Sequence, residues 1–314
     1  MAPRLSESNE IVIMNPANRL LLAVGIAICC GIGCVSSNPR YDNFQSSDLQ
    51  DSEVTVAYGR PHRFADGLAS LVGLPERVLT LHPNVNNHQF SDSTRRHLLT
   101  YLEKNDLTDV YVRVNQYDPV GEWRRLRDNE RIAPGWKYTV GLLPLTMYTL
   151  APGRIFGGDQ YNPFTNSLSI NSDISAVALH EAAYARDVRN RSLPGTYVAI
   201  NELPFLSLWR HAQGIKDVVK YAQQQGDWPT ECETYRVVYP MIGMHIASGG
   251  FHAVLGNEPL EGMFLTPLLP IGGAIAGHAA GEMAVSRRRH ELGLDTADEE
   301  SSSSIQLASW RQKP

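Results

Sequence analysis

Residues 161–187 read YNPFTNSLSINSDISAVALHEAAYARD, and this stretch decides the fold that we expect for the chain. Residues 162–166 are turn formers, because proline fixes its own φ and asparagine tolerates left-handed backbone. Ser167–Ile170 alternates like a short strand, and Ser172 or Asp173 can cap a helix that follows it. The stretch therefore predicts a hairpin that leads directly into a helix.

The predicted helix carries a set of side chains with metal chemistry. His180, Tyr184 and Asp187 share one face of it, and Glu181 lies one step round. In zinc hydrolases a neutral imidazole binds the metal, and a neighbouring carboxylate takes a proton from the metal-bound water. We therefore expect His180 as a zinc ligand and Glu181 as the catalytic base. The alternative is a core histidine beside a surface or capping carboxylate.

A second long helix is expected between about residues 201 and 224, where apolar residues recur at helical spacing. His211 stands one turn after Leu208 and one turn before Ile215, so it lies on the apolar, inward face. Some zinc proteases hold their third ligand on the helix that follows the first. His211 is thus a second candidate ligand, with a core histidine as the alternative.

Six strings, two of which overlap residues 161–187, lie between residues 60 and 217: DVYVRVNQY, EWRRLRDNERIAPGWKYTVG, LAPGRIFGGDQYNPFTNSLSINSD, ALHEAAYARD, GTY and LWRHAQGIKD. Together they resemble a zincin-like, gluzincin-type metallopeptidase family of bacterial envelope proteins. The resemblance implies zinc as cofactor, His180 as first ligand and Glu181 as general base in peptide hydrolysis. It also implies that Asp187 and Asp217 are supporting carboxylates.

Two positions depart from the family pattern. Tyr184 replaces the second histidine of HExxH, and His211 replaces the glutamate ligand. A phenol with a pKa of about 10 is a poor zinc ligand at neutral pH. One hypothesis is a rearranged zinc site made of His180, His211 and Asp187. The other is a pseudoenzyme that keeps the fold and the groove.

A non-enzymatic function competes with both hypotheses. An edge strand near Ser167–Ile170 would let a membrane-associated binding or scaffolding protein capture extended peptides. The expected fold is the same in each case. It is an α+β, zincin-like domain with a small sheet whose edge strand lies over an active-site helix, followed by a second ligand helix and a C-terminal apolar helical hairpin.

The remaining elements are predicted from periodicity and turn chemistry. The pattern favours one or two short helices in residues 63–81 and a helix from a Ser91 cap to Lys104. It favours strands at residues 109–117 and 136–140, a helical or looped excursion at 122–126, and packing of residues 142–150 against the sheet.

The N-terminal sequence resembles a targeting signal that places the protein outside the cytoplasm. Residues 20–34 are apolar, with about the length of a signal h-region. They end in Gly-Ile-Gly-Cys, which resembles a lipobox and predicts Cys34 as a lipid anchor; an uncleaved membrane anchor is the alternative. The net charge of −5 and pI near 6.1 argue against a nucleic-acid partner. We expect an envelope protein on a membrane surface.

Two apolar runs near the C-terminus, residues 237–256 and 263–285, have the length of membrane spans. The histidines within them would be costly in lipid, so a hairpin packed on protein or at the membrane interface is favoured. The predicted organisation is an anchor (1–34), a flexible tether (35–58), a zincin-like domain (59–228), the apolar hairpin (229–290) and a disordered tail (291–314).

Overall fold

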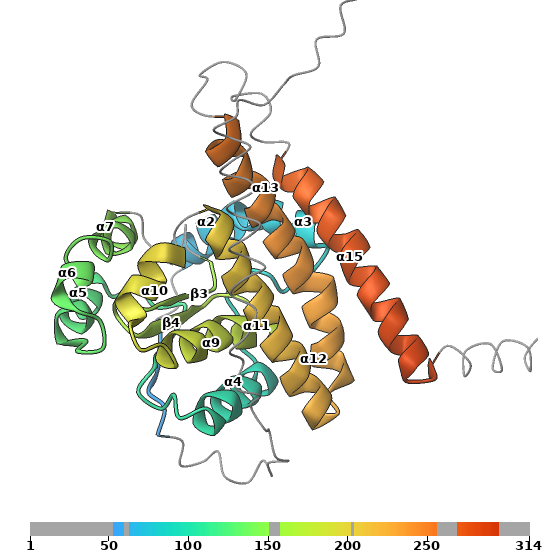
Figure 1. Cartoon of the computed structure of the whole chain (residues 1–314), viewed down its shortest axis with the longest axis horizontal. Coiled ribbons are helices and arrows are strands. Elements are labelled where there is room, and N and C mark those ends of the chain that lie inside the picture. Colours follow the sequence, from blue (N-terminus) through green and yellow to red (C-terminus); the bar gives the residue numbers. More distant parts are fainter. Residues whose placement is uncertain (1–52, 60–62, 151–157, 202–203, 256–268, 295–314) are drawn as a thin grey trace, which may run out of the picture. The chain divides into compact units, whose positions relative to one another are not determined.

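The computed structural model describes residues 53–59, 63–150, 158–201, 204–255 and 269–294. The chain forms two compact units, Met1–Pro39 and Arg40–Pro314, and every described residue belongs to the second. Cys34 with the whole predicted anchor, and most of the predicted tether and tail, lie outside the described residues. The described part is mixed α and β and mostly helical, which confirms the α+β class (Figure 1).

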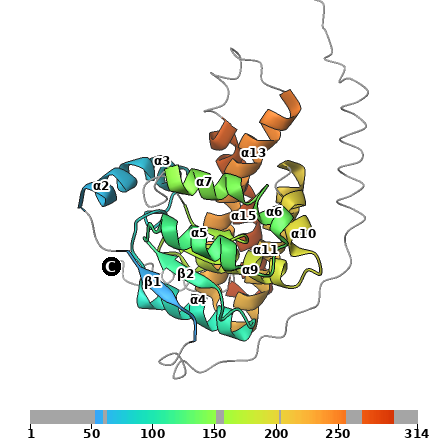
Figure 2. The same ribbon diagram turned by 90° about the vertical axis from the view of Figure 1, so that its left-hand side faces the viewer.

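One four-stranded sheet lies within the helices, with its strands in the order β1-β2-β4-β3. The strands are β1 (Val56–Tyr58), β2 (Tyr111–Val114), β3 (Gln160–Asn162) and β4 (Ser167–Ile170). β1 pairs with β2 and β2 with β4 in parallel, whereas β3 pairs with β4 antiparallel. Figure 2 shows β1 and β2 between α4 and α5. The predicted tether thus ends in a strand of the sheet.

The prediction that Ser167–Ile170 forms the sheet edge is wrong, because β4 has a neighbour on both sides. The two edge strands are β1 and β3, and β3 precedes β4 in the hairpin. A sequence shows that two segments alternate, but it does not show which of them also pairs with a distant strand. In this chain the distant strand is β2, and it takes the free side of β4.

The other regular elements of the described chain are helices. They are α2 (Arg63–Val72), α3 (Leu74–Thr80), α4 (Asp92–Lys104), α5 (Pro119–Asp128), α6 (Pro134–Lys137), α7 (Leu142–Leu150), α9 (Ser175–Arg189), α10 (Pro194–Asn201), α11 (Pro204–Gln225), α12 (Trp228–Glu233), the π-helix η2 (Thr234–Val238), α13 (Tyr239–Leu255) and α15 (Leu269–Glu291). The Ser91 cap is confirmed, since its side chain accepts from the Thr94 N–H. A strand at residues 136–140 was predicted wrongly: a proline at the first position of α6 starts a helical turn instead.

The two faces of the sheet are covered differently. Val112 and Leu168 lie side by side in register and are fully buried in the core shared with α4 and α9. Arg113 and Ser169 point to the opposite face, because strand side chains alternate. There Arg113 meets α5 and α7. The predicted metal-binding helix and the buried arginine are therefore on opposite faces.

The start of α9 is held by residues other than the predicted caps. Asp173 accepts hydrogen bonds from Ser91 and Thr94 at the start of α4. The Ser172 hydroxyl donates to Asp159. Glu233 of α12 instead accepts from the backbone N–H of Ala176, 3.3 Å away. The prediction of Ser172 or Asp173 as the helix cap was wrong, because both side chains bind other segments.

The two apolar C-terminal runs form α13 and α15, which pack closely on each other. Gly243 and Gly273 make this possible: a Cβ on either residue would lie 2.1 Å from the other's carbonyl oxygen. His278 of α15 donates through Nε2 to the Leu79 carbonyl of α3, at 2.9 Å. In the described part of the chain no helix has the length and apolar character to cross a membrane. The residues between α13 and α15 lie outside the described ranges.

Candidate functional site

α9 and α11 bring the two predicted histidines into contact. Nε2 of His180 and Nδ1 of His211 are 3.1 Å apart, and their rings are nearly parallel, with an interplanar angle of 11°. Arg210 donates through Nη2 to Nε2 of His211 at 3.2 Å, since a guanidinium has no acceptor. In the neutral form His211 therefore carries its proton on Nδ1 and donates it to Nε2 of His180.

His180 is buried against a glycine. A Cβ on Gly214 would lie 2.6 Å from Cε1 and 2.7 Å from Nδ1 of the His180 ring, so a larger residue at 214 would displace the imidazole. In the described part of the chain, Nδ1 of His180 has no hydrogen-bond partner. Burial, reinforced by Arg210, lowers the pKa of His180 to about 3 and that of His211 to about 2. Both imidazoles are therefore neutral at physiological pH.

Tyr184, where the resemblance implies the second HExxH histidine, is part of an aromatic and cationic stack. The Arg210 guanidinium lies over its ring, 4.5 Å from the centroid. The ring of Tyr161 meets it edge to face at 5.7 Å. Arg210 therefore connects Tyr184 to His211, and its positive charge lies beside both side chains.

Glu181 binds the edge strand. One of its carboxylate oxygens accepts from the backbone N–H of Tyr161 at 3.0 Å. Residues of an antiparallel strand point their N–H groups alternately toward and away from the partner. The Tyr161 N–H therefore points away from β4, and it donates its hydrogen bond to the Glu181 carboxylate. Burial raises the pKa of Glu181, although the Arg210 charge opposes the change.

Asp187 and Asp217 make ion pairs away from the histidine pair. Asp187 stands seven residues after His180, about 10 Å along the helix axis. Its carboxylate contacts Arg191 at 2.5 Å and accepts from the Tyr197 hydroxyl. Asp217 contacts Arg186 at 3.1 Å and accepts from the Tyr101 hydroxyl. These contacts link α9 to α10, α11 and α4; a metal-binding role for Asp187 stays a prediction.

Two residues close to the pair were not predicted from the sequence: Arg210 and His245. The His245 ring lies 6.0 Å from that of His211, and its Nδ1 donates to the Met241 carbonyl at 2.8 Å. Besides burial, the charge of Asp159, also not predicted, raises the pKa of Glu181; partial burial raises the pKa of Asp159 itself, and it accepts from the Asn171 and Ser172 N–H groups. Arg210 adjoins His211 in sequence, so a search for charges beside candidate ligands would have found it.

The histidine pair supplies two nitrogen donors. In the ranges that the structure describes, no group of three or more histidine, cysteine, aspartate or glutamate side chains is placed to hold a metal ion. Catalytic zinc sites use three protein ligands. The described residues thus bring together two neutral imidazoles and an adjacent guanidinium. Comparisons with family models, curated proteins and solved structures gave no match for this chain.

Proposed function

We propose that this chain is a zincin-like envelope protein whose metal centre has been replaced by a hydrogen-bonded cluster, and that it binds polypeptide without hydrolysing it. The order of elements supports a zincin-like scaffold, because an antiparallel edge strand, β3, lies beside the helix that follows β4. α11 then returns along α9 and places its histidine against His180. This arrangement supports the proposal of a metallopeptidase-like site with altered side chains.

The position of Arg210 carries this proposal. Its guanidinium is 4.5 Å from the Tyr184 ring centre and donates to His211 at 3.2 Å. A permanent cation at this distance opposes the binding of a zinc dication, because the repulsion is strong away from bulk water. Tyr184 also provides a phenol, protonated at neutral pH, where the second histidine of HExxH would provide an imidazole. Both changes act in the same direction, toward a site without metal.

The proposed ligand is an extended polypeptide that pairs with β3. Strand addition to a sheet edge uses main-chain hydrogen bonds and so tolerates many sequences. The outward N–H of Tyr161 is bound to Glu181, so a peptide strand has to displace that carboxylate. Glu181 then acts as a gate on the edge strand rather than as a catalytic base. The strand that we propose to bind peptides is therefore β3 and not Ser167–Ile170.

Zinc-dependent peptide hydrolysis is the second candidate, and one observation favours it. The two facing imidazole nitrogens are 3.1 Å apart, close to the roughly 3.3 Å that tetrahedral zinc imposes on two nitrogen ligands. Two histidines and a carboxylate form a known catalytic set. Glu181 would supply the base in this case. The candidate requires Arg210 to move away from His211.

Metal analysis of the purified chain decides between the two candidates. Zinc content is measured for the wild type, His180→Ala, His211→Ala and, as a control, His290→Ala at the end of α15. The binding proposal expects less than 0.1 equivalent of zinc in all four, together with binding of β-casein, an unfolded polypeptide probe, without cleavage. One equivalent that both site substitutions abolish, with casein cleavage, would establish the peptidase instead.

Location at a membrane surface is a further part of the proposal, and it rests on the sequence around Cys34. Acylation of that cysteine would anchor the domain to a bacterial membrane from outside the cytoplasm. Cys34→Ser is expected to release the protein into the soluble fraction of cells. Continued sedimentation with membranes would favour an uncleaved N-terminal anchor.

A further inference from the structure

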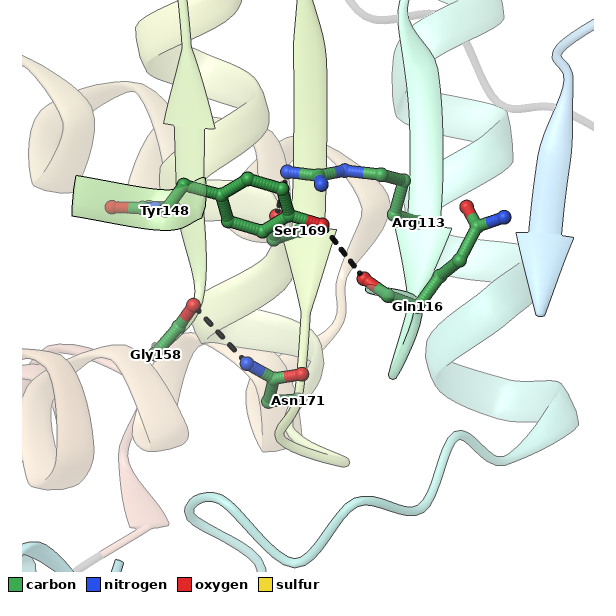
Figure 3. A pocket seen from close by; sticks show the side chains of 7 residues that line it. Arg113, Gln116, Tyr148, Gly158, Ser169 and Asn171 are labelled. Carbon is green, nitrogen blue, oxygen red and sulfur yellow. Dashed lines mark hydrogen bonds between the residues drawn. The ribbon is translucent and has the colours of Figure 1, made fainter. Parts of the chain in front are cut away.

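We propose that the sheet face opposite α9 holds a carboxylate-binding site centred on Arg113. The site is a small cavity whose wall includes Arg113, Gln116, Tyr148, Gln160, Ser169 and Asn171. Figure 3 shows Arg113 reaching from β2 across β4 toward Tyr148 of α7. This site is separate from the histidine pair and does not depend on the proposed function above.

Arg113 is a fully buried cation with few hydrogen bonds. Its side chain is 2% exposed. Nη2 donates to Ser169 Oγ at 2.6 Å, whereas Nη1 and Nε have no hydrogen-bond partner in the described part of the chain. The guanidinium lies over the Tyr148 ring, 4.6 Å from its centroid. A buried N–H without an acceptor lowers the stability of the fold, so a ligand that accepts from these N–H groups would be stabilising.

Glu122 does not complete the bonding of Arg113. One Glu122 oxygen accepts from Arg125 at 2.8 Å, and the other accepts from Ser167 at 2.9 Å. The nearest approach of Nε to this carboxylate is 3.6 Å, too long for a hydrogen bond. The Glu122 carboxylate therefore lies near Arg113 as a counter-charge, but it accepts its hydrogen bonds from Arg125 and Ser167.

The wall chemistry favours an anionic oxygen. The guanidinium offers its unused N–H groups, and the hydroxyl of Ser169 and the amides of Gln160 and Asn171 stand around it. A guanidinium binds a carboxylate through short, charge-assisted hydrogen bonds. The enclosed space is about 10 Å³, which admits a single oxygen atom. We therefore expect one carboxylate oxygen to enter, with the rest of the ligand at the mouth.

Formate and N-acetylglycine are suitable probes, because formate is the smallest free carboxylate and N-acetylglycine resembles a polypeptide C-terminus. Binding is measured on the full chain by ¹³C line broadening of each probe and by the melting temperature, at constant ionic strength against chloride. We expect saturable binding that Arg113→Gln weakens at least tenfold. Tighter formate binding would indicate a small free acid as the ligand, and tighter N-acetylglycine binding a chain terminus.

Two variants keep the test decisive if Arg113→Gln unfolds. Arg113→Gln/Glu122→Gln removes both buried charges together, and Ser169→Ala removes one hydroxyl and leaves the arginine. Both variants are expected to bind the probes more weakly, whereas Arg124→Gln, at an exposed position on α5, should bind them as tightly as the wild type. Equal effects of formate and chloride, or equal binding by wild type and Arg113→Gln, would overturn the proposal and leave the cavity as a water site.

Discussion

His211 donates a hydrogen bond to His180 across the 3.1 Å that separates their ring nitrogens, with its other nitrogen held by Arg210. The lone pair of Nε2 in each histidine therefore accepts a hydrogen bond and is not available to bind a metal ion. The bond also fixes the spacing of α9 and α11, because both side chains are buried.

Acid should destabilise the fold through this pair. The pKa is about 3 for His180 and about 2 for His211, against 6.5 for an unperturbed histidine. Between about pH 3 and 6.5 the unfolded state binds protons that the folded state does not, so the free energy of unfolding falls as the pH falls. The slope reaches about 2.7 kcal/mol per pH unit for both groups.

Urea unfolding at pH 7, 6, 5 and 4, with a metal chelator present, measures that slope. The His180→Asn/His211→Asn variant lacks the two titrating groups and should lose less stability across the window. Parallel pH profiles for the wild type and the double variant would show that acid acts elsewhere.

Gly214→Ala should displace His180 and lower the free energy of unfolding by about 1–3 kcal/mol, because the new methyl group overlaps the imidazole. Gly67→Ala in α2 is the matched control: its Cβ would have nothing within 4 Å, and it should be neutral or stabilise by up to about 1 kcal/mol. Urea denaturation compares the two. Equal stabilities would mean that Gly214 does not hold the ring.

Zinc affinity should return when both obstacles are removed. Tyr184→His supplies the second HExxH imidazole, and Arg210→Ala removes the cation beside His211. We expect the double variant to bind zinc at least a hundredfold more tightly than either single variant, as measured by competition with a chromophoric chelator. Unchanged affinity in the double variant would contradict a zincin-like scaffold at this position.

Glu181→Ala should open the edge strand. Loss of the carboxylate frees the Tyr161 N–H, so binding of labelled β-casein is expected to rise several-fold. Glu181→Gln retains an acceptor oxygen and should resemble the wild type. Weaker casein binding by Glu181→Ala would instead make this carboxylate part of the ligand contact.

The sequence predicted the local elements better than the links between them. The alternation around Val112 and the capping serine at position 91 are short-range signals, and both are confirmed. The inward face of His211 followed from its spacing to Leu208 and Ile215, and the side chain is 9% exposed. These features depend on contacts within one element, so one segment of sequence contains them.

The missed features depend on partners far along the chain. The interior place of β4 requires β2, and the N-terminus of α9 is held by Glu233 of α12. Arg113 alternates with Val112 and Val114 and so points to the other face of the sheet, which α5 and α7 cover. Periodicity alone does not distinguish a solvated face from one that another helix covers.

The mixed pairing of β4 bears on the order in which the chain folds. β3 and β4 are joined by the short turn of residues 163–166, so the hairpin can close within about 1–10 μs. Arg113 and Ser169 face each other across strands that are 56 positions apart, and closing that loop costs more chain entropy. The hairpin and α9 should therefore form an early template on which β2 docks later. Substitutions in the turn should slow folding, whereas substitutions in β1 should mainly speed unfolding.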